Sequence, residues 1–157
     1  MGEAITVPHC FTARRSLGFL LRRGYQLLLP RAEAVFSGRE MTLAQWIALK
    51  VIGEGELTTS SKIANFLGHS SGATTRMIDQ LEHGGLLTRD RLSDDRRVVN
   101  LALTSEGRKA VYEMVPGMGV LWDDVLQDLN EQEVDQLLNL LGRVVDRLEQ
   151  TASEEDR

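Results

Sequence analysis

One predicted helix combines small hydroxyl side chains, a glycine and an arginine on a single face. At about 100° per residue, Gly72, Thr75 and Arg76 lie together, away from four apolar residues that should face a core: Ala73, Met77, Ile78 and Leu81. Arginine can bond to guanine, and threonine can bond to a base edge or touch a thymine methyl. Ser70 and Ser71, at the start of the helix, leave backbone amides that can hold a phosphate. The pattern predicts a helix that reads the major groove of DNA, and the alternative is an amphipathic helix whose polar face meets water.

A charged hairpin tip follows this helix, between two short predicted strands. It contains Asp95, Arg96 and Arg97. An arginine at the end of a hairpin can enter a narrow minor groove, where the negative potential is strongest. Asp95 or its neighbour Asp94 can orient that guanidinium through a bidentate pair. Solvated hairpin charges are the alternative, but the position directly behind the helix favours a contact with DNA.

Hydrophobic periodicity predicts the elements that position these residues. A spacing of three and four residues predicts helices over 11–36, 42–53, 59–67, 71–82, 104–129 and 130–150. A period near two predicts strands over 86–89 and 98–103. Pro30 should kink the first helix or restart it, and the last residues should fray. Helix, turn, helix and then hairpin is a winged helix-turn-helix, so the predicted fold is mainly α with a small β-hairpin wing and further helices around it.

The sequence resembles the MarR-type (multiple-antibiotic-resistance) transcriptional regulators over about residues 12–150. The similarity is densest in five segments that occur in the family's order: 64–68, 76–82, 85–89, 94–97 and 103–107. Ser93 is a departure, because many members carry proline there. The resemblance implies a homodimer, a recognition helix in the major groove, a wing arginine in the minor groove and an effector crevice. It implies Arg96 as the inserted arginine.

The resemblance also implies a division of the chain into regions. A helix of the dimerisation region is expected over 11–40, the winged helix-turn-helix lobe over 41–103, the C-terminal helices of the dimerisation region over 104–150 and a polar tail over 151–157. The last helix supports this division, because its apolar residues form a seam that is too long to leave in water: Val134, Leu137, Leu138, Leu141, Val144, Val145 and Leu148.

Composition and charge exclude several classes of protein. The 157 residues are 42% hydrophobic and 26% charged, which is typical of a globular protein. No apolar run approaches the roughly 20 residues of a membrane span, and no export signal is evident, so we expect a cytoplasmic protein. The net charge is −5, but residues 111–157 alone contain 12 acidic and 3 basic side chains. The rest of the chain is therefore net positive and can still bind an anion.

An effector site and a redox site are harder to identify. A small aromatic acid requires an apolar slot and a cation, and six residues of the helices beside the expected crevice offer both: Arg22, Arg23, Tyr25, Trp46, Met118 and Trp122. Each of them also has an ordinary role in packing or on a solvated face. The single cysteine, Cys10, precedes the first helix, and redox sensing there requires a lowered thiol pKa. His69 and His83 lack metal-ligand spacing, so no metal is expected.

The sequence therefore predicts a dimeric DNA-binding transcriptional regulator, acting as a repressor on a pseudo-palindromic operator and released by a small effector. The alternative is a winged-helix module that binds another protein and no specific DNA. A thiol-based sensor acting through Cys10 is a further alternative. No catalytic triad, phosphate-binding loop or metal cluster is present in the sequence, so neither an enzyme nor a cofactor is expected.

Overall fold

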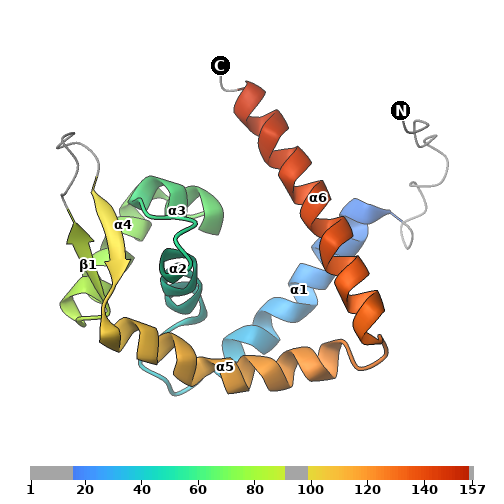
Figure 1. The fold of residues 1–157 in the computed structure, drawn as a ribbon, viewed down its shortest axis with the longest axis horizontal. Coiled ribbons are helices and arrows are strands. Elements are labelled where there is room, and N and C mark those ends of the chain that lie inside the picture. Colours follow the sequence, from blue (N-terminus) through green and yellow to red (C-terminus); the bar gives the residue numbers. More distant parts are fainter. Residues whose placement is uncertain (1–15, 91–98, 156–157) are drawn as a thin grey trace. The chain divides into compact units, whose positions relative to one another are not determined.

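The computed structural model describes residues 16–90 and 99–155. Its elements are α1 (Leu17–Val35), α2 (Leu43–Gly53), α3 (Ser60–Leu67), α4 (Ser71–His83), β1 (Leu87–Asp90), β2 (Asn100–Leu103), α5 (Ser105–Val125) and α6 (Glu131–Glu155) (Figure 1). The strands β1 and β2 pair antiparallel, with Leu87 opposite Leu103 and Asp90 opposite Asn100. The predicted fold class, mainly α with a two-stranded hairpin after a helix-turn-helix, is confirmed.

Side-chain caps fix where the helices begin. At α2, the Gln45 amide donates to Thr42 Oγ1 at 3.2 Å, and the Thr42 amide donates back to Gln45 Oε1 at 2.9 Å. Asn130 and Glu133 repeat this reciprocal arrangement at α6. Such capping boxes satisfy amides that the first helical turn leaves without partners. Both were readable from the sequence, because the capping residue and its partner lie three positions apart.

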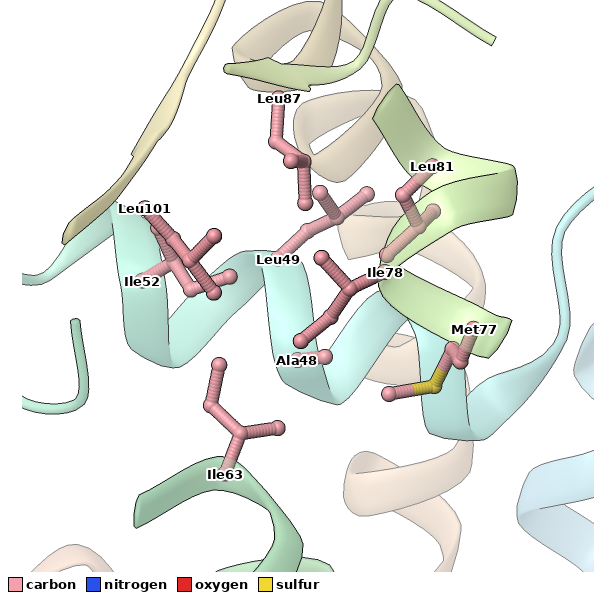
Figure 2. Packing of buried hydrophobic residues seen from close by; sticks show 9 residues of the cluster. All are labelled: Ala48, Leu49, Ile52, Ile63, Met77, Ile78, Leu81, Leu87 and Leu101. Atoms are coloured by element: carbon pink, nitrogen blue, oxygen red, sulfur yellow. The ribbon is translucent and has the colours of Figure 1, made fainter. Parts of the chain in front are cut away.

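The hydrophobic core of the winged helix forms around α2. Figure 2 shows side chains from five elements converging there: Ala48, Leu49 and Ile52 from α2, Ile63 from α3, Met77, Ile78 and Leu81 from α4, Leu87 from β1 and Leu101 from β2. Leu49, Ile63 and Ile78 have no exposed surface. Because α4 contributes one full face to this core, its opposite face is held outward in a fixed orientation.

Helix α5 extends across the division between two compact units of the chain. One unit extends to Met118 and the other begins at Gly119, so the division falls within α5. The first half of α5 belongs to the winged-helix unit because it packs on it. Trp46 Nε1 donates to the Val111 carbonyl at 3.1 Å. Met118 is also buried.

Three local details refine the expectations. Of the two alternatives at Pro30, a kink or a restart, the restart does not occur, because α1 continues from Leu17 to Val35, and a proline removes one amide donor without ending every surrounding bond. Strand β2 begins at Asn100, two residues after the predicted start. Residues 151–155 continue α6, where Thr151 Oγ1 donates to the carbonyls of Arg147 and Leu148.

The buried hydroxyl of Thr74 provides a test of the α4 core. Thr74 is 0% exposed, and its Oγ1 has no hydrogen-bond partner among the described residues. Burying a hydroxyl without a partner costs roughly 1–3 kcal/mol. We therefore expect Thr74→Val to raise the free energy of unfolding by about 1 kcal/mol, measured by urea denaturation. Thr75→Val is the matched control, because Thr75 is exposed and its Oγ1 donates to the Ser71 carbonyl at 2.8 Å. A loss of stability in Thr74→Val would contradict this account.

Candidate nucleic-acid interface

The turn between α3 and α4 sets the direction of the second helix. Gly68 ends α3 with a φ of 64°, a left-handed conformation that glycine adopts without strain. Ser70 then caps α4, and its Oγ accepts from the Ala73 amide at 3.3 Å. The remaining amides of the first turn, beside the exposed Ser71, are therefore open to a partner from outside the chain.

The predicted division of α4 into two faces agrees with the structure in most positions. Gly72, Thr75 and Arg76 are exposed, whereas Met77, Ile78 and Leu81 are buried. Ala73 differs from the expectation because it is only half-buried, and Thr74, which belongs to neither predicted face, is buried. Thr75 Oγ1 donates its proton to the Ser71 carbonyl, so this hydroxyl offers an external partner its lone pairs and its methyl group.

The glycine at position 72 has no explanation within the described part of the chain. A Cβ built on Gly72 meets nothing within 4 Å. Glycine in a helix costs up to about 1 kcal/mol relative to alanine. Because Gly72 is exposed and has no side chain, another molecule can approach the helix backbone closely at this position.

Polar contacts join the strands of the hairpin to the helix-turn-helix, in addition to the core packing of Leu87 and Leu101. The Leu101 amide donates to the Thr58 carbonyl at 2.8 Å, which joins β2 to the segment between α2 and α3. Arg89 of β1 donates to the carboxylates of Asp79 and Glu82 on α4. The hydrogen bond to Asp79 is the main reason that the pKa of Arg89 is raised, although burial opposes it. The sequence did not reveal this contact, because the three residues have no characteristic spacing.

The predicted wing-tip residues Asp95, Arg96 and Arg97 lie outside the described residues, as do Asp94 and Ser93. Cys10 also lies outside them. Within residues 16–90 and 99–155, no group of three or more His, Cys, Asp and Glu side chains is suited to a metal ion. No helix in these ranges is both long enough and apolar enough to cross a membrane.

The six candidate effector residues occupy different environments. Arg22, Arg23 and Tyr25 are exposed on α1. Trp46 is buried against the Phe36 ring, with ring centroids 5.8 Å apart, and its indole N–H is already bonded to Val111. Met118 is buried in the first unit, whereas Trp122 is 40% exposed in the second. Trp46 therefore serves as a core residue in this structure and has no free donor for a ligand.

A cavity that the sequence did not indicate lies within the first unit. Its volume is about 710 Å³, and residues of the α1–α2 loop, α2, α4 and α5 line it together with residues beside β1. Its apolar wall comprises Met41, Leu81, Leu86, Ala110 and Met114, and none of the six candidate effector residues contributes to its lining. Periodicity indicates which apolar residues share one face of a helix, but it does not show where the packed helices leave space between them.

Comparison with known proteins identifies the family. The sequence model of the MarR family matches residues 41–99. The chain is 33% identical over 122 residues to the HTH-type transcriptional regulator PecS of Dickeya dadantii (strain 3937), and the alignment covers 75% of this chain and 74% of PecS.

Solved structures support the same assignment. Wild-type MarR from E. coli, in its apo form, matches with a TM-score of 0.68 and 28% identity, over 82% of this chain and 96% of that one. Bordetella bronchiseptica BpsR matches with a TM-score of 0.69 and 25% identity, over 87% and 97%. Members of the family are transcription regulators and not enzymes, in agreement with the sequence prediction. The chain belongs to the MarR family of transcription regulators.

Proposed function

We propose that the protein is a homodimeric repressor that binds a pseudo-palindromic DNA operator in the cytoplasm and is released by a small aromatic acid. The observation that carries this proposal is the outward face of α4, where Gly72, Thr75 and Arg76 are exposed on a helix anchored by the core. Arg76 supplies a donor pair for guanine, and Thr75 supplies lone pairs and a methyl. Gly72 lets the backbone approach the DNA closely.

Phosphate contacts complete the proposed interface. Ser70, Ser71 and the amides of the first turn of α4 face outward at the positive end of the helix dipole, which favours a phosphate. The wing residues Asp95, Arg96 and Arg97 are proposed to supply the minor-groove contact. These contacts position the protein on the duplex, whereas Arg76 selects the sequence.

The α6 seam supports the proposed dimer. In the single chain, Leu138 is 63% exposed, Leu148 is 59% exposed and Val145 is 50% exposed. Apolar side chains gathered along one helix face are a feature of an interface. We propose that the segments 11–40 and 104–150 form this interface with a second copy. A two-fold dimer places two α4 helices about one DNA turn apart, so half-sites should be centred about 10 base pairs apart.

The effector proposal rests on the basic and aromatic side chains exposed on α1 and on one structural relative, BpsR. The solved structure of BpsR concerns the regulation of its DNA binding by 6-hydroxynicotinic acid. For this chain we propose a small aromatic acid of the same class, whose carboxylate would pair with Arg22 or Arg23 and whose ring would contact Tyr25. Addition of such an acid should weaken operator binding.

The experiment that tests DNA reading starts by selecting duplexes from a random pool with the full chain. We expect a pseudo-palindromic sequence bound with a steep dependence on salt, because phosphate contacts release counterions. Arg76→Ala should then weaken the free energy of operator binding by roughly 1–3 kcal/mol. It should also reduce the preference for one base over the others at one base pair of each half-site. Lys50→Ala is the control, because Lys50 of α2 is paired with Glu54 at 3.1 Å and should leave the preference unchanged.

Three outcomes would contradict parts of this proposal. Selection of no sequence would favour a protein-interaction module over a DNA-binding regulator. An equal loss of affinity for all sequences in Arg76→Ala would mean that Arg76 contacts phosphate and reads no base. An operator affinity that responds to peroxide but to no aromatic acid, and loses that response in Cys10→Ser, would replace the proposed effector with a thiol switch.

A further inference from the structure

Two carboxylates of α4 are held by one guanidinium from the hairpin. Arg89 Nη2 donates to Asp79 Oδ1 at 2.5 Å, and Arg89 Nη1 donates to Glu82 Oε2. The Arg89 side chain is 26% exposed, whereas those of Asp79 and Glu82 are 56% and 37% exposed. A guanidinium can serve two carboxylates at once because its donors form a rigid planar fork. The two acids would otherwise meet solvent on a helix that has been proposed to face DNA.

Asp79 has a second basic neighbour on its own helix. It lies three residues after Arg76, and both side chains belong to the exposed face of α4. Side chains three or four positions apart on a helix are neighbours, and an Asp–Arg pair at this spacing is attractive. Among the described residues, none forms an ion pair with Arg76 while Arg89 occupies Asp79. Glu82 lies six residues after Arg76, so it is not a neighbour of that kind.

We infer that Arg89 is a positioning residue for base recognition, because by holding Asp79 it leaves the Arg76 guanidinium free to reach a base edge. The inference rests on the proposed function, in which α4 reads the major groove. It gives β1 a role besides supporting the wing. When Arg89 is absent, Asp79 pairs with Arg76 along the helix, and the same carboxylate also stands unneutralised beside the DNA phosphates.

The decisive experiment compares two double variants of equal charge. Arg89→Gln is made alone, with Asp79→Asn and with Glu82→Gln in the full chain. Each is titrated against the duplex that the wild-type protein selects and against the same duplex with the base pair read by Arg76 replaced. The readout is the ratio of the two affinities. Thermal unfolding and light scattering of each variant report separately on stability and assembly.

We expect Arg89→Gln to reduce that ratio about tenfold, which is the size of one arginine–guanine recognition pair. Adding Asp79→Asn should restore most of the ratio, whereas adding Glu82→Gln should not, although both double variants carry the same net charge. Arg89→Lys should reduce the affinity ratio only in part, because one ammonium group keeps the positive charge but does not reproduce the guanidinium's simultaneous contact with both carboxylates.

Four results would overturn the inference. Equal rescue by both double variants would mean that only the total charge near DNA matters. No rescue by either would mean that Arg89 itself contacts the DNA or braces the fold, and the melting temperature would distinguish these two roles. An unchanged ratio in Arg89→Gln would show that Asp79 never competes for Arg76. If the wild-type protein discriminates no base pair at all, the proposed function fails, and this inference falls with it.

Discussion

Replacing Gly107 with alanine should lower the free energy of unfolding by about 3 kcal/mol, near the upper end of the usual cost of overpacking. A Cβ at this position in the first turn of α5 would lie 1.9 Å from the Leu86 carbonyl oxygen and 2.9 Å from the Leu86 carbonyl carbon. Both atoms belong to the backbone, so no change of side-chain rotamer can relieve the clash. The helix or the segment before β1 would have to move.

Several hydrogen bonds hold the two backbones at this distance. The Thr104 amide donates to the Leu86 carbonyl at 3.2 Å, and Thr104 Oγ1 donates to the Gly85 carbonyl at 2.6 Å. The same Oγ1 accepts from the Gly107 amide at 3.0 Å. Separating α5 from Leu86 to make room for a methyl group would therefore disturb this cap as well. These hydrogen bonds hold the start of α5 and the base of the hairpin in a fixed relative position, so that neither can move without the other.

Gly119→Ala is the matched control, because it makes the same substitution in the same helix. A Cβ there meets nothing within 4 Å, so alanine should be neutral or stabilise the protein by up to about 1 kcal/mol through helix propensity. Urea denaturation of the two variants and the wild type measures the difference. Equal stability of Gly107→Ala and Gly119→Ala would show that α5 can shift away from Leu86 at little cost.

Much of the helix-turn-helix could be predicted from the sequence because its signals are local. Ser70 predicts a helix start, and Met77, Ile78 and Leu81 repeat at the spacing of one buried face. The exposed position of Arg76 follows from the same periodicity. These features depend on residues within one or two helical turns, so no knowledge of distant contacts is needed.

The remaining features depend on contacts between segments far apart in the chain. The Arg89 contact with Asp79 joins a strand to a helix, and the close approach of Gly107 to Leu86 joins a helix to the start of a hairpin. Trp46 is a candidate for a ligand slot by its residue type, with core packing as the alternative, and the structure places its ring and N–H in packing contacts. A single sequence specifies which side chains are apolar or charged, but it does not state which distant partner satisfies each of them.

The second large effect that we expect comes from substituting a residue of the apolar seam of α6. Leu141 lies at the centre of the face that also bears Leu138, Val145 and Leu148, which are exposed in the single chain. Leu141→Asp would place a charge among these side chains in the proposed dimer, and burying a charge without a partner is strongly unfavourable. We therefore expect light scattering at micromolar concentration to give about 17.5 kDa, the mass of one chain.

Loss of the dimer should also remove tight binding to the operator. Two linked half-site contacts bind more strongly than one because the second is intramolecular, and this advantage is about 100-fold or more. Asn139→Asp adds the same charge to the opposite, exposed face of α6, so it should leave both the dimer mass and the operator affinity unchanged. Val145→Asp provides a second seam variant in case Leu141→Asp does not fold. If both seam variants remain dimers with wild-type operator affinity, α6 does not form the interface, and the exposed side chains of that helix require a different partner.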